Sequence, residues 1–178
     1  CSETAELFFD DCRVPKANLV GQEGKGFGIA MNSLDGARIG VGAIALGLAE
    51  GALDESLSYI EQRVQFGKPI SKLQGIQWYI ADMATEIETA KWMVYHAAYL
   101  RTVGKPYTKE ASMCKLHNSK VAREVTNLAM QIHGGYGYMK EYPVERMYRD
   151  AKITEIYEGT SEIQKVIIAK QVMSAAKK

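Results

Sequence analysis

The chain has 178 residues, of which 47% are hydrophobic and 24% are charged. This composition is typical of a globular protein with enough apolar side chains for the buried core of one domain. The formal net charge of +1, with both signs interspersed, argues against nucleic acid or an anionic membrane as the main partner.

Cysteine and histidine content limits the redox and metal chemistry. The three cysteines are odd in number and have no Cys-x-x-Cys spacing, which suits a reducing compartment. His96, His117 and His133 do not have metal-ligand spacing with cysteines or carboxylates. We therefore expect neither a disulfide framework nor a metal site.

No membrane-spanning or targeting segment is evident. The longest apolar stretch, 39–49, is too short to cross a bilayer and is flanked by Arg38 and Glu50, so we expect no membrane insertion. The sequence begins with Cys1 inside a strand-like pattern. We expect the chain to be the C-terminal portion of a longer protein.

The first residues predict one strand and a linker. Leu7, Phe8, Phe9 and Val14 precede Pro15 and predict a short strand over 5–14, whose partners would lie outside the chain. The Gly-rich connector 18–28 lacks the spacing of a dinucleotide loop and leads into a helix. We assign residues 1–22 to the end of a preceding domain and 23–178 to a helical domain.

Apolar residues then recur in steps of three and four over three long segments. The first seam contains Ile39, Ala43, Leu46, Glu50, Leu53, Leu57, Ile60 and Val64. The second contains Ile76, Ile80, Met83, Ile87, Ala90, Val94 and Ala97, and the third Cys114, Asn118, Val121, Val125, Leu128 and Ile132. With a C-terminal helix, these three seams predict an all-α, antiparallel four-helix bundle.

Two pairs of glycines, Gly36/Gly40 and Gly47/Gly51, lie four residues apart within the first of these segments. Because glycine has no side chain, they could allow the backbone of a neighbouring helix to approach closely.

The turn before the C-terminal helix carries a carboxylate, Glu158. Ser161 and Gln164 fit a capping box for that helix. At a helix N-terminus, N–H groups can bind a substrate oxygen while the carboxylate takes a proton. A simpler interpretation is that Glu158 only complements the helix dipole. This segment alone does not exclude the simpler interpretation.

Several segments, taken together, resemble the C-terminal part of the acyl-CoA dehydrogenase flavoenzymes, of the short-chain, butyryl-CoA dehydrogenase-like type. They occur in family order and cover nearly the whole chain from Leu7 onward. The matching segments are 20–27, 35–40, 63–69, 131–137, 141–146, 149–153 and the turn at Glu158. The resemblance implies a C-terminal four-helix bundle, preceded by the last strand of a middle β-domain.

In this family the reaction is the FAD-dependent α,β-dehydrogenation of an acyl-CoA to the trans-2-enoyl-CoA, in fatty acid or amino acid catabolism. By resemblance, Glu158 is the base that removes the α-proton, and its N–H helps to bind the thioester oxygen. Some members carry the base just before the position of Arg38. Here that residue is Ala37, which cannot take a proton.

The resemblance also assigns binding roles. The implied FAD contacts are Arg63, Gln74, Gln131, Ile132, His133, Gly134, Gly135, Thr160, Ser161 and Glu162. The implied substrate contacts are Asp35, Gly36, Ala37, Arg38 and Gly159. Arg63 would pair with the FAD pyrophosphate of a neighbouring subunit. Alternatively, Arg63 and Gln74 belong to a solvated loop, and Asp35 and Arg38 form only a local ion pair.

The resemblance further implies a homotetramer, a dimer of dimers, that passes electrons to an electron-transfer flavoprotein in the bacterial cytoplasm or mitochondrial matrix. We expect the 178 residues alone to be inactive. A second hypothesis is a non-catalytic helical bundle for oligomerisation or partner binding. The presence of Glu158, Arg63 and the Gly-rich segment 134–137 favours the enzyme, because a scaffold needs none of them.

Overall fold

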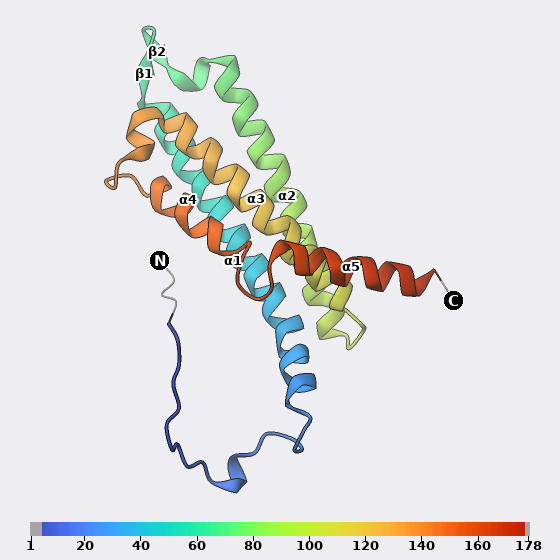
Figure 1. Cartoon of the computed structure of the whole chain (residues 1–178). Coiled ribbons are helices and arrows are strands. Elements are labelled where there is room, and N and C mark those ends of the chain that lie inside the picture. Colours follow the sequence, from blue (N-terminus) through green and yellow to red (C-terminus); the bar gives the residue numbers. More distant parts are fainter. Residues whose placement is uncertain (1–4, 177–178) are drawn as a thin grey trace.

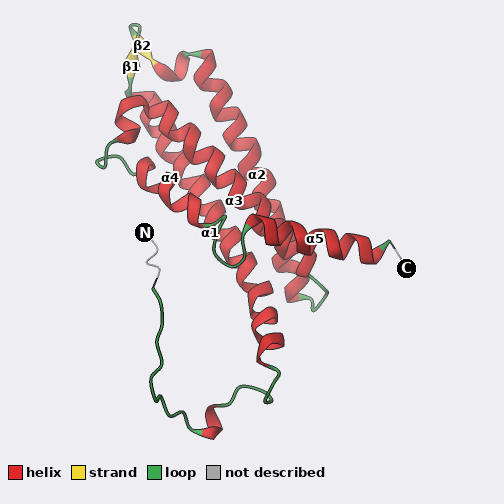
Figure 2. Cartoon of the chain, in the orientation of Figure 1, coloured by secondary structure: helices red, strands yellow, loops and turns green. Residues whose placement is uncertain are grey.

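Three long helices form the body of the domain. The computed structural model describes residues 5–176, and in it α2 runs antiparallel to both α1 and α3 (Figures 1 and 2). The short connections between successive helices, 63–73 and 103–107, require this alternation. The long helices are α1 (Gly26–Gln62), α2 (Gln74–Thr102) and α3 (Thr108–His133).

The fourth helix of the bundle is α4 (Val144–Ile153), which packs on α3 and α1. The C-terminal helix α5 (Ser161–Ala175) packs on α3 and extends away from the body (Figure 1). The prediction of an all-α four-helix bundle is confirmed, but the choice of its fourth helix was wrong. The ten residues of α4 bury only Val144 and Ala151, too few to produce a periodic signal in the sequence.

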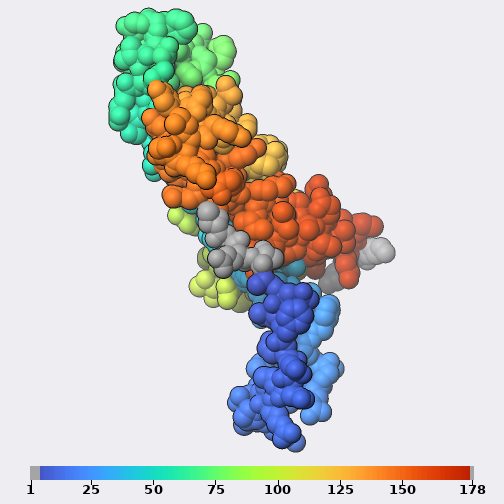
Figure 3. All heavy atoms as spheres, turned by 60° about the vertical axis from the view of Figure 1, so that its left-hand side comes forward, coloured from blue at the N-terminus to red at the C-terminus, as the bar shows by residue number. Residues whose placement is uncertain are grey.

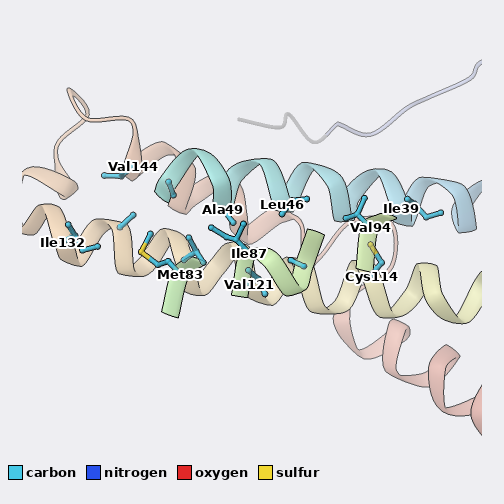
Figure 4. Close-up of a cluster of buried hydrophobic side chains, with 14 of the residues drawn as sticks. Ile39, Leu46, Ala49, Met83, Ile87, Val94, Cys114, Val121, Ile132 and Val144 are labelled. Atoms are coloured by element: carbon cyan, nitrogen blue, oxygen red, sulfur yellow. The ribbon is translucent and has the colours of Figure 1, made fainter. Parts of the chain in front are cut away.

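The core lies between α1, α2 and α3, where the side chains labelled in Figure 4 converge. The seams predicted for α2 and α3 are buried or half-buried, as expected. The seam predicted for α1 is confirmed at Ile39, Leu46 and Ile60, which are buried, whereas Ala43 and Leu57 are exposed. Small residues also occupy the buried face of α1, and they let α3 approach closely. These small residues are Gly42, Ala45, Ala49 and Ala52.

Helix α1 approaches α3 closely at Gly42. A Cβ atom on Gly42 would lie 2.4 Å from Sγ of buried Cys114. The amide Nδ2 of Asn118 donates to the carbonyls of Gly42 and Ala90, at 3.1 Å each, and so joins α3 to both neighbouring helices. Of the four glycines predicted for this role, Gly40 and Gly47 face open space, and Gly36 and Gly51 face side chains, of Arg101 and Met147, rather than a neighbouring backbone.

Alanine at Gly42 and at Gly40 should have opposite effects on stability. Both substitutions gain about 1 kcal/mol of helix propensity. Only Gly42→Ala overpacks the α1–α3 contact, which costs about 1–3 kcal/mol. We therefore expect the free energy of unfolding of Gly42→Ala to lie that far below the value for Gly40→Ala, measured by urea denaturation of the intact protein. Equal stability of the two variants would contradict this packing.

Within residues 5–25 no strand forms. Residues 5–14 have no regular structure, and the segment 5–25, which contains a 3-10 turn, η1 (Lys16–Asn18), makes a loop that extends past the start of α1 (Figure 3). Phe8 and Phe9 are 81% and 79% exposed. The strand predicted over 5–14 is not formed here; it stays a prediction, because the partners expected for it lie outside the chain. Cys1 lies outside the described residues.

Between α1 and α2 lies a small hairpin of β1 (Val64–Gln65) and β2 (Lys68–Pro69), paired antiparallel, followed by the 3-10 turn η2 (Ile70–Lys72). Phe66 and Gly67 form its tip with positive φ, 53° and 75°. After α3 a further 3-10 segment, η3 (Gly134–Tyr138), leads toward α4.

Within residues 5–176, α1 is the one helix long and apolar enough to cross a bilayer. Its buried residues pack against α2, α3 and α4, as in the core helix of a bundle. Packing in the core of the bundle therefore accounts for the apolar character of α1.

Candidate active site

The turn between α4 and α5 places Glu158 in an unusual backbone conformation. Glu158 has φ 56° and Gly159 has φ 94°, so two consecutive residues lie in the positive-φ region. That region is costly for a residue with a side chain and is enriched at functional sites. Such a turn persists only if its surroundings hold it.

Two buried side chains hold the carbonyls of this turn. Nζ of Lys115, on α3, donates to the carbonyl of Gly159 at 2.7 Å. Nε2 of Gln164, on α5, donates to the carbonyls of Glu158 at 3.3 Å and Gly159 at 2.9 Å. Lys115 and Gln164 are both 0% exposed. The turn is therefore fixed from the bundle side and from its own following helix.

The start of the turn is anchored at Thr154 and Glu155. Oγ of Ser119 donates to the carbonyl of Thr154 at 2.8 Å. Arg123 and Lys152 pair with the Glu155 carboxylate at 3.0 and 2.6 Å. Burial alone would raise the pKa of Glu155, but the hydrogen bonds from Lys152 and Arg123 outweigh it and hold the pKa below its usual value.

Glu158 itself keeps its functional groups free. In the described part of the chain, neither its carboxylate nor its N–H makes a hydrogen bond, and the carboxylate forms no ion pair. Thr160 is the N-cap of α5, and its Oγ1 accepts from the N–H of Ile163 at 3.5 Å. The predicted Ser161–Gln164 capping box is wrong, because the Gln164 amide binds the turn instead.

The predicted substrate residues on α1 lie close to the same lysine. Arg38 is 4% exposed and pairs with Asp35 at 2.6 Å, and Thr108 donates to the second Asp35 oxygen at 2.6 Å. The local ion pair foreseen for Asp35 and Arg38 is therefore present. Burial is the main reason that the pKa of Lys115 is lowered to about 8; the charge of Glu155 acts in the opposite direction, Arg38 also lowers the pKa, and Glu158 raises it. Arg38, Lys115 and Glu158 are thus close enough to interact electrostatically.

The other predicted substrate residues on α1 have packing roles. A Cβ atom on Gly36 would lie 3.2 Å from the guanidinium of Arg101, so Gly36 provides space for that side chain. Ala37 is half-buried.

The predicted cofactor residues separate into two groups. Thr160, Ser161 and Glu162 line a cavity of about 720 Å³ between α3 and α5. Arg123 of α3 also lines this cavity, whereas Ile132 lines the cavity of the second group. The α3 linings of the two cavities are therefore at least about 14 Å apart along the helix, at 1.5 Å per residue.

The second group lies at the other end of the bundle, beside the β1–β2 hairpin. A cavity of about 660 Å³ there is lined by Arg63, Ile132, His133, Gly134 and Gly135. Gln74 and Gln131 are exposed and do not line it. The structure therefore brings together five of the predicted cofactor residues here and leaves those two amides at the surface.

Aromatic side chains that the sequence analysis did not identify support this second cavity. The Arg63 guanidinium lies 5.2 Å from the ring centroid of Tyr136. Tyr59 stacks on His133 with centroids 4.1 Å apart, and its hydroxyl donates to the carbonyl of His133 at 3.3 Å. Gly134 has φ 60°. A permanent cation beside open glycine backbone fits an anionic group such as a pyrophosphate.

His133 is held neutral by its surroundings. Burial lowers its pKa, against a hydrogen bond with the Ala129 carbonyl, 2.8 Å from Nδ1, and the charge of Glu55. An imidazole with a lowered pKa resists protonation in the folded state. The unfolded chain therefore takes up the proton first as the pH falls through the ordinary value of 6.5.

The free energy of unfolding of the intact protein should consequently decrease between pH 7.5 and 5.5. His133→Phe should flatten this dependence, whereas His96→Phe, at an exposed position on α2, should leave it unchanged. Urea denaturation at the two pH values measures both. An equal slope in His133→Phe and the parent protein would contradict the assignment.

The sequence analysis did not identify Lys115, and it interpreted Gln164 only as a helix cap. The one available signal was a lysine at 115, next to the apolar seam position Cys114, where a long charged side chain is unusual. In residues 5–176, no cluster of three or more His, Cys, Asp or Glu residues could hold a metal ion.

The matches to known proteins cover nearly the whole chain. Residues 24–173 match the family described as acyl-CoA dehydrogenase, C-terminal domain. The chain is 72% identical over 172 residues to acryloyl-CoA reductase (NADH) of Anaerotignum propionicum, covering 97% of this chain and 44% of that protein. It is 57% identical over 171 residues to the short-chain-specific acyl-CoA dehydrogenase of Clostridium acetobutylicum, covering 96% and 45%.

Among solved structures, butyryl-CoA dehydrogenase of Megasphaera elsdenii matches with a TM-score of 0.91 and 53% identity, over 93% of this chain and 43% of that one. The chain thus spans less than half the length of these relatives. This chain belongs to the acyl-CoA dehydrogenase family, whose C-terminal helical domain it contains.

Proposed function

We propose that the chain is the C-terminal part of an FAD-dependent enzyme that dehydrogenates a short-chain acyl-CoA to the trans-2-enoyl-CoA, with Glu158 as its base. One observation carries this proposal: the carboxylate and N–H of Glu158 are free on a turn that Lys115 and Gln164 hold in a strained conformation. A scaffold would gain nothing from this arrangement, which argues against a non-catalytic bundle.

The groups of Glu158 suit the abstraction of a proton next to a thioester. The carboxylate takes the proton from C2, and negative charge develops on the thioester oxygen. The N–H of Glu158 donates to that oxygen, and such a donor typically contributes about 3–4 kcal/mol to transition-state stabilisation. FAD, when bound, accepts the hydrogen that leaves C3 as hydride. Asp35 and Arg38 lie near the turn, as substrate contacts would require.

The division of the cofactor residues supports an oligomeric site. Arg63 and the backbone at Gly134 and Gly135 would hold the pyrophosphate, while Thr160 to Glu162 would contact the cofactor near Glu158. The α3 residues that line the two cavities are separated by at least nine residues, about 14 Å along the helix, in one chain. We therefore propose that neighbouring copies complete each site in a homotetramer, a dimer of dimers. An electron-transfer flavoprotein would be the electron partner, in the bacterial cytoplasm or mitochondrial matrix.

A second candidate is the reverse reaction, the reduction of a short 2-enoyl-CoA. The 72% identity to an acryloyl-CoA reductase favours it. The geometry of Glu158 serves both directions, because a protonated Glu158 can return the proton to C2.

Anaerobic mixing experiments with the intact enzyme separate these possibilities. Butyryl-CoA added to the oxidised enzyme should bleach the flavin absorbance and yield crotonyl-CoA. Faster turnover of acryloyl-CoA with NADH and an electron-transfer flavoprotein would favour the reductase instead. A protein that does neither, with flavin bound, would be the non-catalytic bundle.

A further inference from the structure

Lys115 is a buried charge that the proposed reaction does not use directly. It lies within α3, is 0% exposed and, within residues 5–176, forms no ion pair. The charged groups around it come from several elements: Arg38 on α1, Glu155 and Glu158 in the turn, and Glu162 on α5. Burying an ammonium group without a paired carboxylate is costly. A lysine retained at this cost is a candidate for a functional role.

The hydrogen bond of Lys115 is directed at the strained part of the turn. Its Nζ lies 2.7 Å from the carbonyl oxygen of Gly159, which also accepts from Gln164 at 2.9 Å. Because Gln164 already satisfies that carbonyl, a second donor is not needed merely to avoid a buried unpaired acceptor. A charged donor forms a shorter and stronger bond than a neutral one, and so it resists rotation of the adjoining peptides.

We propose that Lys115 is a positioning residue whose buried ammonium group locks the Glu158–Gly159 turn, so that the Glu158 carboxylate is presented to the substrate. The inference rests on the proposed role of Glu158 as the base. Lys115 acts through the backbone and contacts neither substrate nor cofactor.

This role predicts opposite pH effects on activity and stability. The pKa of Lys115 is lowered to about 8, mainly by burial, from an ordinary value of 10.5. Above pH 8 the neutral amine makes a weaker bond to Gly159, so kcat should decline on the alkaline side. Between pH 8 and 10.5 the unfolded chain holds the proton more tightly than the folded protein, so this group's contribution to the unfolding free energy rises with pH.

Lys115→Met in the intact, flavin-loaded enzyme tests the proposal. Methionine has a similar volume without the charge, so we expect an unchanged or higher melting temperature and unchanged flavin content. We expect kcat to fall at least tenfold with KM within twofold, and the alkaline decline near pH 8 to disappear. Amide hydrogen exchange in residues 154–160 should accelerate at least tenfold. Lys109→Met, at a lysine on the same helix whose side chain is 42% exposed, should change none of these.

A kcat within twofold of the parent value, or unchanged exchange in 154–160, would overturn the proposal. If Lys115→Met does not fold, amide hydrogen exchange of the parent enzyme at two pH values tests the proposal instead. Its protection in 154–160, corrected for intrinsic exchange rates, should drop between pH 7.5 and 9 relative to α2, and constant protection would overturn the proposal. The rate of amide hydrogen exchange in residues 154–160 does not depend on whether Glu158 acts as the base. An active Glu158→Gln enzyme would therefore refute the proposed function, whereas slow exchange in Lys115→Met would refute only the role of Lys115.

Discussion

Glu158→Gln in the intact enzyme should lower kcat for acyl-CoA dehydrogenation by about 10²–10⁴-fold, the usual contribution of a positioned general base. Glutamine keeps the shape of the side chain and the backbone N–H but cannot accept the proton. Lys115 and Gln164 bind backbone carbonyls, so the turn should keep its conformation. We therefore expect flavin content and KM to remain near the parent values. Steady-state kinetics and the flavin spectrum measure all three.

A matched control is Glu61→Gln, at an exposed position on α1. It should leave kcat within twofold of the parent value. Activity of Glu158→Gln within tenfold of the parent, about 1.4 kcal/mol of barrier, would exclude Glu158 as the base. A large loss of bound flavin in this variant would instead indicate a structural role for Glu158.

Arg63→Ala should weaken flavin binding by about 10–100-fold, because a hydrogen bond to a charged group is worth about 1.5–3 kcal/mol. In the described part of the chain the Arg63 guanidinium makes no hydrogen bond, and it lies over the Tyr136 ring. It is therefore available for an anionic ligand. Arg63→Lys should recover only part of the affinity, since lysine lacks the planar fork and stacks less well on the ring.

Titration of the flavin-free enzyme with FAD measures this effect. Lys68→Ala, which removes an exposed cation from the same hairpin, is the control and should bind FAD as the parent does. Equal affinities of Arg63→Ala and the parent would show that Arg63 only belongs to a solvated loop.

The helices of the bundle were largely predictable because their seams are made of large apolar residues. On α2 and α3, side chains such as Ile87 and Val121 mark the buried face in steps of three and four. On α1 the contact with α3 is made by glycine and alanine, and following its larger residues placed exposed Leu57 in the seam. The strand at 5–14 depended on a partner edge, which local sequence cannot provide.

The candidate site was predictable in its identity but not in its support. The turn at Glu158 and the group around Arg63 were found by their resemblance to a family, and the structure adds that they are far apart in one chain. The bonds that hold the turn join side chains to carbonyls across tertiary contacts. Local patterns classified Gln164 as a helix cap and gave no partner for Lys115, because neither bond is visible in the spacing of residues.

A structure of the intact enzyme with FAD and an unreactive acyl-CoA analogue is the most direct test of Glu158 as the base. A carboxylate oxygen of Glu158 should lie about 3–3.5 Å from C2 of the ligand, the separation of a reactive complex. The thioester oxygen should accept a hydrogen bond from the N–H of Glu158. A different carboxylate beside C2, or a Glu158 side chain directed away from the ligand, would contradict the proposed function.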